Sequence, residues 1–70
     1  MDFVEIELID QRIIYINIRN IVSILKYQGQ TMINCVDNNS FAVAGEPDDI
    51  MIAIDSVYFD KLKTERRIND

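Results

Sequence analysis

Carboxylates are the commonest side chains in this sequence that could do chemistry, and two groups of them could act together. Glu5 and Glu7 stand two residues apart in an apolar segment, so in a strand they would share one face. Paired carboxylates can do acid–base chemistry when their surroundings separate their pKa values. The chain has no histidine, no obvious nucleophile and no glycine-rich loop to complete such a site. We therefore interpret the pair as a solvated strand face and predict no catalytic residue.

The second acidic group is formed by Glu46, Asp48 and Asp49. These residues lack the spacing and the glycine of a calcium-binding loop. They directly precede a helical pattern, and acidic side chains stabilise the positive end of a helix dipole. We predict a helix start here, and no metal and no cofactor anywhere in the chain.

The single cysteine, Cys35, has no partner for a disulfide within the chain. It lies in phase with Ile33 in a predicted strand, and a buried cysteine behaves as a small apolar side chain. A reactive thiol would need nearby cations or a helix N-terminus to lower its pKa, and neither is close in the sequence. We interpret Cys35 as a core residue.

Length and charge limit the possible functions. A chain of 70 residues forms one domain, and such a domain buries only about 60% of its unfolded surface, so packing or oligomerisation must stabilise it. Residues 1–60 carry ten acidic and three basic side chains, whereas residues 61–70 carry four basic and two acidic ones. The net negative charge of residues 1–60 argues against nucleic-acid binding, because phosphate contacts need cations.

The N-terminus, Met1-Asp2, lacks the basic start of a signal peptide. No apolar run approaches the ~20 residues that a membrane-spanning helix needs. We expect a complete cytoplasmic protein with no membrane partner.

Five short isoleucine-rich segments, separated by turn residues, read as strands. Val4, Ile6 and Leu8 alternate with polar residues, as in a half-buried strand. Because all connections are short, we predict an α+β fold in which a five-strand antiparallel meander, open or curled into a half-open barrel, precedes one helix. The predicted strands cover residues 3–9, 12–18, 21–27, 31–36 and 40–44.

The first hairpin has a predicted register. A three-residue loop from Asp10 to Arg12 groups Ile6 and Leu8 with Ile14 and Ile16 on one face. A loop one residue shorter would exchange the two faces. We therefore favour the longer loop.

The predicted helix runs from Pro47 to about Thr64, which gives a domain over residues 1–64 and a polar, frayed tail over residues 65–70. Residues 50–54 are apolar on every side of this helix, so a small sheet cannot bury them all. A second apolar face indicates a second partner, and we expect a homo-oligomer or docking to another protein. Tyrosine and methionine are common in interface cores, and the predicted interface residues are Tyr15, Tyr27, Met51, Ile52, Tyr58 and Phe59.

One pattern of segments and turns combines Leu8 to Gln11, Ile16-Asn17, Asn20 to Ile24, Thr31, Ile33, Asp37-Asn38, Phe41 and Val43. Over residues 3–57, this pattern resembles the FlbD-like family of small bacterial flagellar-operon proteins. The resemblance implies this fold and no active site, and we do not carry over the family's motility role. The family has glycine where this chain has Gln11 and Asn38. Residues 12–44 also resemble the strands of LytTR-type DNA-binding domains, but the basic motif of that domain is absent.

Three functions fit these observations. The first is a non-catalytic protein-interaction module that self-associates through its helix and an apolar sheet face. The second is an acidic inhibitor of phage type, which would occupy a basic site on a nucleic-acid-handling protein. The third is a small-ligand binder whose pocket forms between subunits.

Overall fold

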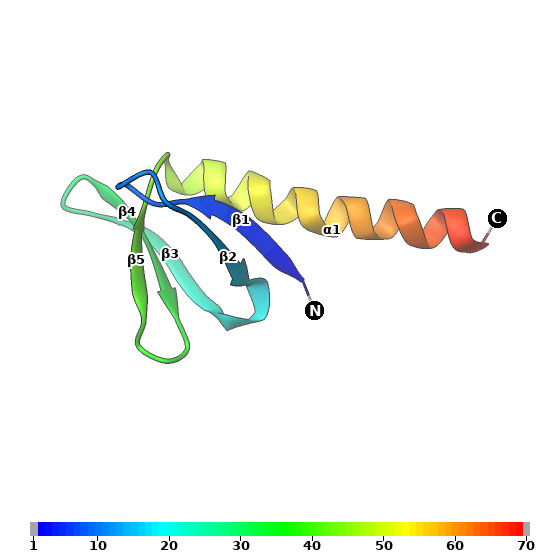
Figure 1. Cartoon of the computed structure of the whole chain (residues 1–70), viewed down its shortest axis with the longest axis horizontal. Coiled ribbons are helices and arrows are strands. Elements are labelled where there is room, and N and C mark those ends of the chain that lie inside the picture. Colours follow the sequence, from blue (N-terminus) through cyan, green and yellow to red (C-terminus); the bar gives the residue numbers. More distant parts are fainter. Residues whose placement is uncertain (1, 70) are drawn as a thin grey trace.

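The computed structural model describes the backbone of residues 2–69 and the side chains of residues 2–60 and 62. Five strands and a 3-10 turn precede one long helix (Figure 1). The elements are β1 (Phe3–Glu7), β2 (Ile13–Asn17), η1 (Ile18–Asn20), β3 (Ile21–Tyr27), β4 (Gln30–Cys35), β5 (Ser40–Val43) and α1 (Pro47–Asn69). The predicted α+β class and element order are confirmed.

The strands form two antiparallel sheets rather than the single meander that the sequence predicts. One sheet pairs β1 with β2, and the other has the order β3-β4-β5. At the end of β2 the Asn17 side chain accepts a hydrogen bond from the Arg19 backbone N–H at 3.1 Å, which starts η1 and turns the chain away from β2. Because η1 intervenes, β2 and β3 lie in different sheets.

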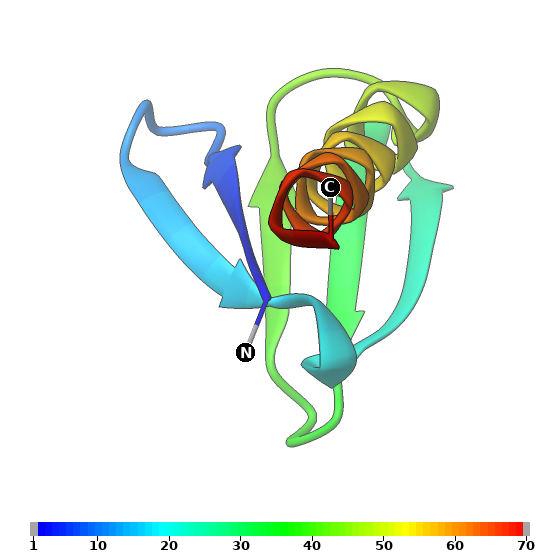
Figure 2. The same cartoon turned by 90° about the vertical axis from the view of Figure 1, so that its right-hand side faces the viewer.

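The two sheets meet at one corner, where the end of β1 approaches the end of β5. Leu8 forms an isolated antiparallel bridge with Val43. The Ile9 N–H donates to the Ala42 carbonyl, and the Ala44 N–H donates to the Glu7 carbonyl at 2.9 Å. Figure 2, which views α1 end-on, shows the helix between the β1–β2 hairpin and β3.

The first hairpin keeps the predicted faces but not the predicted loop. Val4 pairs with Ile16 and Ile6 with Ile14, so the apolar residues of both strands share the core face as expected. The Leu8 N–H donates to the Arg12 carbonyl, which places the loop at residues 9–11, one position earlier than predicted. The pairing therefore shifts by two residues, and an even shift preserves the faces.

The core lies between the sheets and α1. Strand alternation supplies most of it, η1 supplies Ile18, and the first turns of α1 supply Ile50 and Ile54. The buried apolar residues are Val4, Ile6, Leu8, Ile16, Ile18, Ile33, Val43, Ile50 and Ile54.

Helix α1 begins at Pro47 as predicted. Asp49 accepts a hydrogen bond from the Glu46 N–H through its Oδ2 atom at 2.8 Å, while the Asp49 N–H donates back to the Glu46 carbonyl. Lys26 Nζ lies 2.7 Å from Glu46 Oε2, which ties this start to β3. The acidic group thus organises the helix N-terminus.

The end of α1 lies at Asn69, beyond the predicted end near Thr64. The side chains of residues 65–70 fall outside the described part of the structure, and so does the backbone of Asp70. Fraying of this tail stays a prediction.

Replacing Gln11 by glycine is expected to stabilise the fold by about 1 kcal/mol. Gln11 has a φ of 75°, in the left-handed region that costs an L-residue roughly 1–2 kcal/mol, and the greater freedom of unfolded glycine offsets part of the gain. Urea unfolding at fixed protein concentration measures the change. Gln11→Ala is the matched control, because it keeps the Cβ atom and should give no gain. An unchanged midpoint for Gln11→Gly would contradict the expectation.

Candidate protein-interaction surfaces

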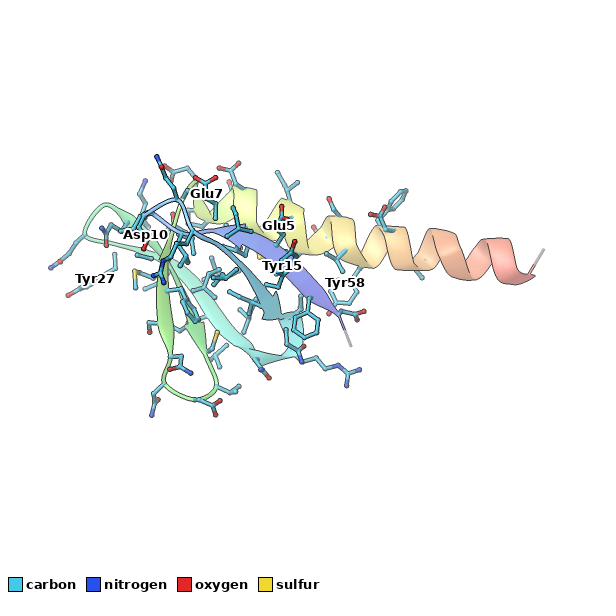
Figure 3. The ribbon with its side chains drawn as sticks, in the orientation of Figure 1. Glu5, Glu7, Asp10, Tyr15, Tyr27 and Tyr58 are labelled. Atoms are coloured by element: carbon cyan, nitrogen blue, oxygen red, sulfur yellow. The ribbon has the colours of Figure 1, made fainter. Side chains whose placement is uncertain are left out.

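The paired carboxylates of β1 lie on an exposed strand face. Tyr15 is the cross-strand neighbour of Glu5, and its hydroxyl donates to Glu5 Oε1 at 3.0 Å. This hydrogen bond and the nearby negative charge raise the pKa of Tyr15. Figure 3 shows Glu5 and Tyr15 side by side on neighbouring strands. Within the described residues, no group of three or more acidic, cysteine or histidine side chains could hold a metal ion.

Cys35 ends β4 and packs against the core, half-buried. Burial raises the pKa of the Cys35 thiol, and the neighbouring Asp37 carboxylate raises it further. A higher pKa leaves less thiolate, which is the nucleophilic form. The geometry agrees with a packing role for this residue.

We expect Cys35 to react slowly with a thiol reagent such as Ellman's reagent at pH 8. The folded protein should react at least tenfold more slowly than the same chain in 6 M guanidinium chloride, because burial limits both access and ionisation. Asp37→Asn should speed the folded reaction modestly by removing the adjacent charge. Equal rates in the folded and unfolded chains would contradict the assignment.

The six predicted interface residues are all exposed, but they do not form one patch. Figure 3 shows Tyr27 at the turn between β3 and β4, far along the molecule from Tyr58 on α1. Tyr15 lies on the outer face of the β1–β2 sheet. The remaining three also lie on α1, and they are Met51, Ile52 and Phe59.

Three of the four predicted interface residues on α1 line two hollows. Met51 lines one of about 310 Å³ together with Val22 and Ile24 of β3. Ile52 and Phe59 line another of about 330 Å³ with Asp55, Ser56 and Asp60. This second hollow is formed by helix residues alone, so it belongs to a helix face that the sheets leave uncovered.

The later turns of α1 extend past both sheets (Figure 1). Among the described side chains of the helix, Ile54 is the last buried one, and Val57 is the last that packs against the core. Beyond it, Tyr58, Phe59 and Leu62 are 42%, 62% and 60% exposed. In the described part of the chain, no helix combines the length and the apolar character needed to cross a membrane.

A cleft that the sequence analysis did not predict lies between β2 and the β4–β5 hairpin. Its volume is about 400 Å³, and Ile14, Ile16, Cys35 and Phe41 form its apolar lining. Polar side chains of three chain segments complete it, namely Asn17, Asn20, Asp37 and Asn39. Because these segments meet only in the tertiary structure, no local sequence signal could have shown the cleft.

One side of this cleft is a free strand edge. Arg12 and Ile18, which flank β2, both make backbone hydrogen bonds toward β1 or its flanks. Antiparallel pairing alternates along a strand, so the N–H and C=O groups of Ile13 and Tyr15 point away from β1. The edge is short, and exposed edges of this kind can accept another strand.

Comparison of the chain with protein-family models, with curated proteins and with solved structures gives no match in any of the three.

Proposed function

We propose that this protein is a non-catalytic interaction module that forms a homo-oligomer through α1. The observation that carries the proposal is the run of exposed apolar side chains on the turns of α1 that extend past the sheets. Tyr58, Phe59 and Leu62 are all exposed there, whereas Ile50 and Ile54 earlier in the helix are buried in the core.

Helix stability supports this proposal. In proteins, most helical stability comes from packing of an apolar face rather than from helix propensity. The segment that follows Val57 is 12 residues long up to Asn69. A second helix packed against this segment would bury the exposed side chains of Tyr58, Phe59 and Leu62.

The size of the domain also supports self-association. A chain of 70 residues has a small core, and such cores rarely contribute more than roughly 3–5 kcal/mol of net stability. Burying an exposed leucine or phenylalanine side chain contributes about 1.5–3 kcal/mol. A few such side chains from each copy would therefore add stability comparable with that of the core itself.

We also propose that the protein is cytoplasmic and has no enzymatic activity. The unpaired Cys35 suits a reducing compartment. Glu5 and Glu7 are both exposed, and the hydrogen-bond partner of Glu5 is the hydroxyl of Tyr15, which is exposed as well.

Light scattering after gel filtration, over a concentration series, tests the proposal. We expect an absolute mass that is a multiple of 8.2 kDa and that falls toward 8.2 kDa only on dilution. A mass of 8.2 kDa at every concentration would overturn it. In that case, salt-dependent binding to a nucleic-acid-handling protein would favour the acidic inhibitor instead.

A further inference from the structure

The charge of α1 is divided along its length. Residues 47–60 carry four acidic side chains and no basic one, at Asp48, Asp49, Asp55 and Asp60. Residues 61–69 carry four basic side chains and one acidic one. The helix is therefore acidic over its first half and basic over its last turns.

We infer that two copies of this protein pair through α1 in an antiparallel orientation, so that the acidic half of each helix lies beside the basic end of the other. The inference rests on the proposed function, and it adds the number of copies and the orientation of the two helices. A two-fold axis near Phe59 relates the two helices. Such an interface is isologous, the commonest arrangement in soluble homodimers.

Electrostatics selects this orientation over the parallel one. In a parallel pair, the four acidic side chains of one helix would face the same four of its partner, and like charges held together disfavour pairing. In an antiparallel pair, each acidic half meets a basic end. The helix dipoles also oppose each other in this arrangement, which is favourable.

The part of each copy that precedes α1, which we call its body, also favours the antiparallel orientation. Residues 1–46 carry six acidic and three basic side chains, so each body is net negative. A parallel pair would place two negative bodies side by side at one end of the helices. The antiparallel pair separates them and brings each basic helix end toward the partner's negative body.

The contact face follows from burial on α1. Ile50 and Ile54 face the sheets, whereas Ile52 and Phe59 are more than half exposed. These two lie seven residues apart and so occupy one line along the helix. They line the hollow of about 330 Å³ together with Asp55 and Asp60. This surface is therefore apolar along its centre and has acidic side chains beside it. The partner's basic end complements this composition.

Distances between spin labels test the orientation. A nitroxide is attached at Ala44→Cys in a Cys35→Ser background, because Ala44 is exposed and lies three residues before α1. For an axis near Phe59, the starts of the two helices are about 36 Å apart along the helix axis, from a rise of 1.5 Å per residue. An in-register parallel pair would hold the helix starts only about 10 Å apart.

We expect the long distance in the dimer. A dimer with the short distance would overturn the antiparallel geometry while leaving the proposed function standing. A monomer at every concentration would overturn both. The circular dichroism spectrum of the labelled chain, compared with that of the parent chain, checks that the fold is kept.

Charge reversal gives an independent test with its own rescue. Asp55→Lys should raise the dimer Kd about tenfold, because this residue is level with the basic end of the partner helix, which then meets a lysine at both copies of the site. Adding Lys61→Glu, Lys63→Glu, Arg66→Glu and Arg67→Glu to the same chain should restore most of the affinity. A parallel pair would regain no affinity from these four substitutions. Failure of the rescue in a folded chain would overturn the antiparallel geometry.

Discussion

Replacing Ile33 by alanine is expected to remove most of the stability of the domain. Ile33 is 0% exposed, and it lies on β4, the central strand of its sheet. It pairs with Ile24 on one side and with Phe41 on the other. Truncating a buried isoleucine to alanine costs about 2–5 kcal/mol, since it removes apolar contacts and leaves a cavity. That cost approaches the roughly 3–5 kcal/mol that a core of this size supplies.

Urea unfolding followed by circular dichroism measures this loss. Because association stabilises the folded state, parent and variant are compared at one protein concentration. Val22→Ala is the matched control, since Val22 is 66% exposed on the neighbouring strand β3. We expect the control to change the free energy of unfolding by no more than about 0.5 kcal/mol. An Ile33→Ala midpoint equal to that of the control would contradict the assigned core.

The second large effect is expected on association. The double substitution Phe59→Gln with Leu62→Gln should raise the dimer Kd at least 100-fold. Both side chains lie on the turns of α1 that extend past the sheets and are exposed in the single chain. Removing apolar anchors from the centre of an interface typically costs 2 kcal/mol or more each, and about 1.4 kcal/mol changes an affinity tenfold. Glutamine keeps the helix propensity of this segment.

The mass in solution and the free energy of unfolding separate an interface role from a core role. We expect the double variant to be a folded monomer over concentrations at which the parent is oligomeric. Val36→Gln serves as the control, because Val36 is an exposed apolar residue that lines the cleft beside β2. Loss of association in the control but not in the helix variant would move the interface from α1 to the cleft. An unfolded double variant would place Phe59 and Leu62 in the core.

Local sequence signals determined several elements of this fold. Alternation of Val4, Ile6 and Leu8 determined which face of β1 is buried, because adjacent residues of a strand point to opposite faces. The turn of Gly45, Pro47 and Asp49 determined where α1 begins. In each case the decisive interactions join residues that are close in the sequence.

Other features depended on contacts between distant segments. The hairpin loop was misplaced by one position because Gln11 adopts a positive φ that its side chain does not signal. The division into two sheets follows from the turn that Asn17 caps and from the meeting of Leu8 with Val43. Alternation alone could not show which strands would pair.

The sequence by itself determined the α+β class, the buried faces, the helix start and the uneven charge of α1. The tertiary structure alone decided the two-sheet arrangement, the cleft beside β2 and the extension of α1 past the sheets to Asn69. No glycine or proline follows Thr64, so the sequence carries no signal for where the helix ends. How much of α1 the sheets cover is visible only in the folded chain. That uncovered length is what directs the functional proposal to a second copy.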